Sequence, residues 1–65
     1  MKIGERVIVS AAVTGDGIHH SGVIEDIYVF LRTTFVDVRF DKPTPWGTWG
    51  ATVTNPELIR KEVVV

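Results

Sequence analysis

The strongest constraint on the fold is the period-2 pattern between positions 34 and 41, in which apolar and charged residues alternate from Val36 to Asp41. One parity is occupied by Thr34, Val36, Val38 and Phe40. The other parity holds Phe35 and three charged residues. Because successive side chains of a β-strand point to opposite faces, this pattern predicts a strand with one buried face. Two prolines shortly after position 41 end it, since proline donates no hydrogen bond to a sheet.

Four further segments favour strands, and none favours a long helix. They are residues 6–13, 23–31, 46–54 and 59–64. In the second of these, Ile24 and Ile27 have opposite parity, so we expect a bulge near Glu25–Asp26 that resets the register. Asn55 and Pro56 match the cap and first residue of a single helical turn before the last strand.

These elements predict one all-β domain spanning residues 1–65. The pattern favours a five-stranded SH3-like barrel. It combines five short strands, a long first loop with glycines at 15 and 17, and one short 3-10 turn before the last strand. A chain of 65 residues without cysteine has no disulfide to stabilise it and is expected in the cytoplasm. No apolar run is long enough to cross a bilayer, so we expect no membrane insertion.

Several segments resemble one group of small barrels. Ile3–Val9 is similar to the G-x-x-V-x-V first strand of KOW-like and photosynthetic SH3-like subunits, and Gly22–Ile27 to their G-x-V-x-x-I second strand. Residues 36–42 and the turn at Asn55–Leu58 resemble the photosystem I subunit IV family. The resemblance covers most of the chain in spacing. It implies an SH3-like fold and a non-catalytic subunit of a membrane complex that helps acidic electron carriers to dock.

The sequence offers little for catalysis, metals or cofactors. Ser10 and Ser21 have no evident base, and a barrel this small fills its own interior, so we expect no enzyme and no cofactor. His19 and His20, with Asp16 nearby, are the only metal-ligand candidates. Adjacent residues of an extended segment point to opposite sides, so we expect a solvated polar loop and no metal site.

Aromatic residues are the strongest candidates for binding, because they supply large, stiff contact surfaces. Trp46 and Trp49 flank a predicted hairpin and either cap the core or lie on the surface; the sequence leaves both alternatives open. Phe35 has the parity of the solvent face, which indicates a contact surface. The predicted partner-binding residues are Trp46, Trp49, Tyr28, Phe35, Arg39 and Lys42.

The predicted function is a non-enzymatic binding module, a small accessory or docking subunit that contacts a protein partner through its aromatic loop surface. One alternative is nucleic-acid binding in the manner of KOW or Tudor-like barrels. Seven basic and eight acidic residues, interleaved along the chain, argue against the basic surface that phosphate backbones require. The other alternative is a structural barrel whose strand edges pair into a homo-oligomer.

Overall fold

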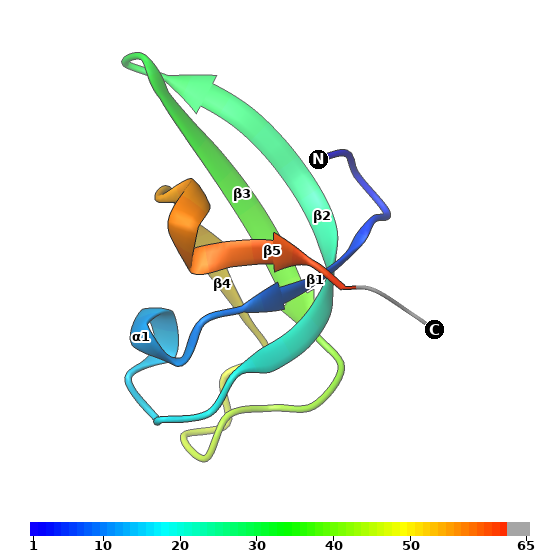
Figure 1. Cartoon of the computed structure of the whole chain (residues 1–65), viewed down its shortest axis with the longest axis vertical. Coiled ribbons are helices and arrows are strands. Elements are labelled where there is room, and N and C mark those ends of the chain that lie inside the picture. Colours follow the sequence, from blue (N-terminus) through cyan, green and yellow to red (C-terminus); the bar gives the residue numbers. More distant parts are fainter. Residues whose placement is uncertain (63–65) are drawn as a thin grey trace.

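Five strands form one antiparallel sheet in the computed structural model, in the order β4-β3-β2-β1-β5 (Figure 1). They are β1 (Arg6–Val9), β2 (His20–Phe30), β3 (Thr33–Phe40), β4 (Gly50–Val53) and β5 (Ile59–Lys61). The structure describes residues 1–62. Within that range the edge strands β4 and β5 do not pair with each other, so the sheet is not closed. The all-β prediction with five strands is confirmed, whereas closure into a barrel is not shown.

One face of the sheet carries the core. Eight apolar side chains from all five strands are buried there: Val7, Val9, Ile24, Val36, Val38, Phe40, Val53 and Ile59. In Figure 1 the long strand β2 is strongly curved, and β1 and β5 lie across β3 and β4. The buried side chains lie between these two parts of the sheet. The predicted inward parity of β3 is therefore confirmed for Val36, Val38 and Phe40, whereas Thr34 of the same row is exposed.

A bulge bends β2, so that side chains on both sides of the bend pack against the core. Ile24 lies opposite Val38 and Asp26 lies opposite Asp37, which leaves Glu25 as the extra residue. Ile24 is buried, and Ile27 packs against the same core despite its opposite parity. An extra residue bends a strand and increases its twist. The predicted bulge is confirmed at the predicted place.

The first strand is shorter than the alternation predicts. It ends at Val9, and the helical turn α1 (Ala11–Thr14) replaces the rest of the predicted strand 6–13. The Ser10 hydroxyl caps this turn by accepting the N–H of Ala12 at 3.2 Å, and Gly15 ends it with φ +74°. These caps favour a helical turn over continued extension. The connection between α1 and β2 covers residues 15–19, because β2 begins at His20 and not at the predicted Val23.

The C-terminal half also differs in its boundaries. β4 is limited to Gly50–Val53, and residues 46–49 of the predicted strand 46–54 lie in the connection that precedes it. The predicted 3-10 turn is confirmed as η1 (Pro56–Leu58), and the Asn55 side chain accepts the N–H of Glu57 at 3.0 Å. The last strand was predicted over 59–64, of which residues 63 and 64 lie outside the described residues. Among residues 1–62, no helix has the length and apolar character to cross a membrane.

Gly22 in β2 supplies a test of the packing. A Cβ at this position would lie 2.3 Å from the carbonyl oxygen of Arg39, so the backbone of β3 would have to move. We expect Gly22→Ala to lower the free energy of unfolding by about 1–3 kcal/mol, measured by urea unfolding. Ser21→Ala is the control and should change this free energy by about 0.5 kcal/mol or less. An unchanged midpoint for Gly22→Ala would contradict the packing.

Candidate functional site

The β2–β3 hairpin extends past the rest of the sheet as a two-stranded arm, residues 27–35. β1 pairs with β2 no further than Val23, and β4 pairs with β3 no further than Val36. Apart from Ile27, which pairs with Val36, residues of the arm therefore pair only with each other, and the arm projects from the body of the molecule (upper left in Figure 1). Both outer backbone edges of the arm are free of strand partners within the described chain.

The end of the arm is apolar and exposed. Val29, Phe30 and Leu31 expose 70%, 63% and 81% of their surface, respectively. Single exposed apolar residues are ordinary, but a contiguous group of them marks a contact surface. No acidic residue occurs between Asp26 and Asp37, and Arg32 is the only charged residue in that interval. The arm is thus an apolar projection with one positive charge at its tip.

Two of the predicted binding residues stiffen this arm. Tyr28 and Phe35 lie opposite each other on β2 and β3, and their rings stack with centroids 5.1 Å apart and planes 8° from parallel. Aromatic pairs across two strands stabilise a hairpin that has no further neighbours. Phe30 lies two residues beyond Tyr28, on the same face of the arm.

The turn at the tip of the arm is strained. Leu31 and Arg32 connect the paired residues Phe30 and Thr33, with φ angles of +50° and +63°. A two-residue hairpin with two positive φ angles normally carries Asn-Gly, because a side chain on Cβ disfavours this conformation. Each non-glycine residue held there costs about 1–2 kcal/mol. Strain at an exposed position outside the core is a common mark of a functional segment.

The second aromatic feature is a short turn that displays Trp46. Gly47 N–H donates to the carbonyl of Thr44 at 2.9 Å, and Thr44 N–H donates to the carbonyl of Thr48 at 2.8 Å. The buried hydroxyl of Thr44 also accepts the N–H of Thr48 at 3.1 Å. With Pro45 before it and the left-handed Gly47 after it, Trp46 lies in the turn type that three-residue hairpin loops prefer.

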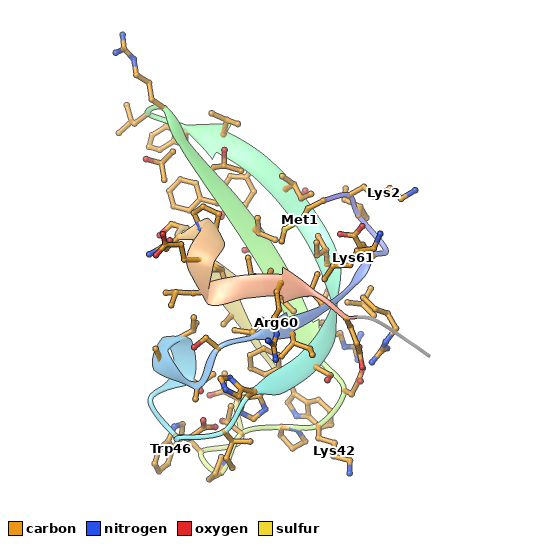
Figure 2. All side chains as sticks on the ribbon, in the orientation of Figure 1. Met1, Lys2, Lys42, Trp46, Arg60 and Lys61 are labelled. Carbon is orange, nitrogen blue, oxygen red and sulfur yellow. The ribbon has the colours of Figure 1, made fainter. Side chains whose placement is uncertain are left out.

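Both tryptophans lie on the surface, which decides between the two alternatives left by the sequence. Trp46 exposes 70% of its surface and Trp49 exposes 54%. Trp49 lines a shallow pocket together with Arg39, whereas Trp46 and Lys42 lie at the end of the molecule opposite the arm tip (Figure 2). The six predicted binding residues therefore do not form one surface.

Residues 29–31 are the part of the candidate site that sequence reasoning missed. The signal is the run of consecutive apolar residues Val29, Phe30 and Leu31. Such a run is typical of a buried strand, and only the register with β1 and β4 reveals that nothing covers it.

A buried hydrogen bond between His20 and Asp16 corrects the prediction that residues 16–20 form a solvated loop. His20 Nε2 lies 2.6 Å from Asp16 Oδ2, and the imidazole stacks on Phe40 with centroids 4.7 Å apart. The other carboxylate oxygen accepts the Thr14 hydroxyl at 2.6 Å and the N–H of Ile18 at 3.0 Å. The Asp16 side chain is only 1% exposed. The loop prediction is wrong for His20 because Phe40 and Asp16 remove it from water.

His19 points to a different environment. It is exposed, and its Nδ1 accepts the N–H of Ala11 at 3.0 Å. Among residues 1–62, no three His, Cys, Asp or Glu side chains gather in a way that could hold a metal ion. His19 and His20 therefore have separate structural roles.

The hydrogen bonds around Asp16 lower its pKa to about 2. The hydrogen bond from the Thr14 hydroxyl lowers this pKa most, whereas burial of the carboxylate raises it. The hydrogen bonds from His20 and from the N–H of Ile18 lower the pKa further. Hydrogen bonds to a carboxylate favour its charged form.

Comparison of the chain with models of protein families, with curated proteins and with solved structures found no match.

The strained turn predicts a stabilising substitution. Replacing Leu31→Asn together with Arg32→Gly should raise the free energy of unfolding by about 1 kcal/mol, because these residues accept positive φ and neither original side chain belongs to the core. Urea unfolding measures the change. Arg60→Gly is the control: it adds glycine within β5 and should lower stability by about 0.5–1 kcal/mol. A lower free energy of unfolding in the Leu31→Asn, Arg32→Gly variant would contradict the inference that the turn is strained.

The Asp16 carboxylate predicts a dependence of stability on acid. Its pKa in the folded chain, about 2, lies below its ordinary value of 3.8, so its stabilisation is complete above about pH 4 and is lost as the pH falls toward 2. We expect Asp16→Asn to flatten the fall in Tm across this range, as followed by circular dichroism.

Asp41 is the matched control for this experiment. Hydrogen bonds from Arg6 also lower the pKa of Asp41 below its ordinary value. Asp41→Asn should therefore leave the Asp16 component of the acid sensitivity in place. A wild-type profile for Asp16→Asn would contradict the predicted linkage.

Proposed function

We propose that this domain is a non-enzymatic binding module that docks onto a protein partner through its arm, residues 27–35. One observation carries the proposal: Val29, Phe30 and Leu31 are strongly exposed at the end of a stiff hairpin and contribute nothing to the core. Proteins seldom leave contiguous apolar surface in water unless a partner covers it.

The chemistry of the arm favours a partner with an apolar groove bordered by acidic side chains. Phe30 and Leu31 offer two large apolar anchors, and the stacked pair Tyr28–Phe35 offers a flat aromatic face. Arg32 is the only charge on the arm, so carboxylates at the rim of the groove complement it. The free backbone edges also allow a partner strand to add to the arm.

The SH3-like interpretation belongs to this proposal. The strand order β4-β3-β2-β1-β5 and the 3-10 turn before β5 support a partly open SH3-like barrel. The resemblance to KOW-like and photosystem I subunit IV proteins supports an accessory role without catalysis. Because one fold serves many functions, the partner is inferred from the arm and not from the fold.

The charges give less support to nucleic-acid binding. Arg6 is bound by the carboxylates of Asp41 and Glu62, the latter at 3.0 Å. Arg32 lies at the tip of the arm, whereas residues 60 and 61 lie on the edge strand β5. Affinity for a phosphate backbone requires several unopposed cations on one surface. Protein docking is therefore the function that the geometry supports best.

Photochemical crosslinking tests the proposal in cells of the source organism. With the photoreactive amino acid benzoylphenylalanine in place of Leu31, we expect one discrete adduct with another protein. The same amino acid in place of the exposed Lys61 should give no such adduct. Adding Phe30→Ser to the Leu31 crosslinking variant should reduce the adduct yield about tenfold, because anchor residues dominate binding energy.

Three results would overturn the proposal, provided that circular dichroism shows each variant to be folded. Adducts of equal yield from positions 31 and 61 would show unspecific contact. An adduct with twice the mass of the chain would identify a second copy as the occupant of the arm. An adduct that contains nucleic acid would favour nucleic-acid binding over protein docking.

A further inference from the structure

A cavity of about 510 Å³ opens between the arm and the turn η1. Most of its wall is apolar and is formed by Met1, Ile27, Val36, Val53, Pro56 and Ile59. Three of these residues, Val36, Val53 and Ile59, belong to the buried core. The cavity is therefore an end of the core that residues 1–62 leave open, and we name it the mouth of the core.

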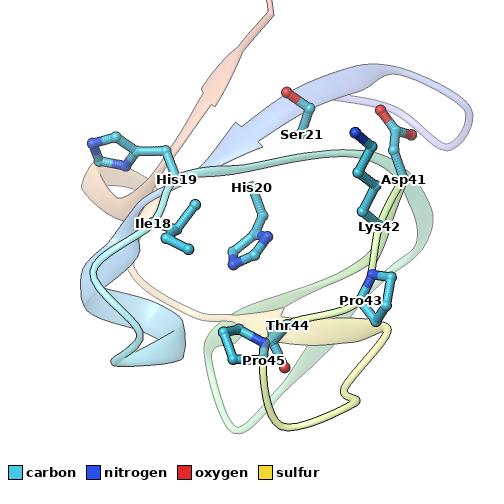
Figure 3. A pocket seen from close by; sticks show the side chains of 9 residues that line it. All are labelled: Ile18, His19, His20, Ser21, Asp41, Lys42, Pro43, Thr44 and Pro45. Atoms are coloured by element: carbon cyan, nitrogen blue, oxygen red, sulfur yellow. The ribbon is translucent and has the colours of Figure 1, made fainter.

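A cavity of similar volume, about 550 Å³, lies at the end of the molecule opposite the arm tip (Figure 3). Its polar groups do not converge, because the Ser21 hydroxyl points away from the ring of His20. In the mouth of the core, by contrast, the polar lining includes Arg32 and Thr34 from neighbouring positions of the arm.

The backbone of Thr34 forms a free strand edge beside this mouth. On the β4 side of β3, the Phe40 N–H donates to the carbonyl of Trp49 at 2.8 Å. Backbone groups of a strand alternate between its two edges, so those of Val38, Val36 and Thr34 point to the same side. β4 pairs with β3 no further than Val36. Within residues 1–62, no strand therefore pairs with the N–H and C=O of Thr34 on this side.

The opposite edge of the arm, on β2, is less open to a strand. Ile27 pairs with Val36, whose backbone groups face β4, so the backbone groups of Ile27 point to the outer edge of β2. There the Ile27 N–H donates to the carboxylate of Asp26 at 2.9 Å. A charged side chain on an edge hinders the pairing of another strand. The β3 edge at Thr34 is therefore the more accessible edge of the arm.

We propose that an extended segment of the docked partner pairs with the β3 edge at Thr34 and inserts a large apolar side chain into the mouth of the core. This inference rests on the proposed docking function and specifies the segment of the partner that the arm receives. Added strands bind through their backbone, and pockets select their alternate side chains. A carboxylate on the same segment complements Arg32, which lines the cavity and forms no ion pair within residues 1–62.

Photochemical crosslinking from the mouth of the core tests this inference in cells of the source organism. Thr54 is exposed and lines the cavity. With benzoylphenylalanine in place of Thr54, we expect an adduct of the same mass as the adduct formed from position 31. A common mass shows that one partner contacts both the tip of the arm and the mouth.

Proline at position 34 tests the pairing of the partner with the strand edge. Thr34→Pro removes an N–H that bonds to no strand within residues 1–62, and edge strands accept proline. It should lower the adduct yield from position 54 about tenfold, because a buried carbonyl of the partner loses its donor. Lys61→Pro is the matched control and should leave the yield unchanged. Its N–H faces the free edge of β5, since the next N–H, that of Glu62, donates to Arg6 of β1.

The outcomes distinguish this inference from docking itself. An adduct from position 31 without one from position 54, or two adducts of different mass, would overturn the inference and leave docking through the arm in place. These results require no proline variant, so they decide the matter even if Thr34→Pro does not fold. A folded Thr34→Pro chain with an unchanged yield would also overturn the inference. The absence of adducts from both positions would overturn the docking function as well.

Discussion

The burial of eight apolar side chains on one face of a single sheet is the interaction on which the rest of this structure depends. A chain of 65 residues without cysteine has no disulfide to stabilise it. Apolar burial, which contributes about 25 cal/mol per Å², is therefore its main source of stability. The bulge at Glu25 extends that burial, since it lets β2 contribute Ile24 and Ile27 on either side of a bend. Segments whose side chains lie outside this core are not needed for its burial and can serve in binding.

The arm and the turn that displays Trp46, residues 44–48, have large apolar side chains that are exposed and not part of the core. Each is stiffened locally, the arm by the stacked Tyr28–Phe35 pair and the turn by hydrogen bonds of Thr44. Side chains that are already held in place lose less entropy when a partner binds. Their positions at opposite ends of the molecule allow two separate contacts (Figure 2).

The sequence predicted features that follow from alternation and missed those that depend on distant contacts. The inward row of β3 and the bulge near Glu25 follow from parity alone. β1 was predicted too long because capping by Ser10 leaves no trace in an apolar–polar alternation. The burial of His20 depends on Phe40, twenty positions away, and the exposure of residues 29–31 depends on where β1 and β4 stop pairing. Neither can be derived from local spacing.

The free energy of unfolding of the double variant Phe30→Ser, Leu31→Ser tests most directly whether the arm tip serves binding and not folding. Both side chains are strongly exposed, so the account predicts a urea unfolding free energy within about 0.5 kcal/mol of wild type. Ile24→Ala, in the core, should lose about 2–5 kcal/mol in the same measurement. A loss of about 2 kcal/mol or more in the arm variant would contradict the account, because it would show that the tip stabilises the fold.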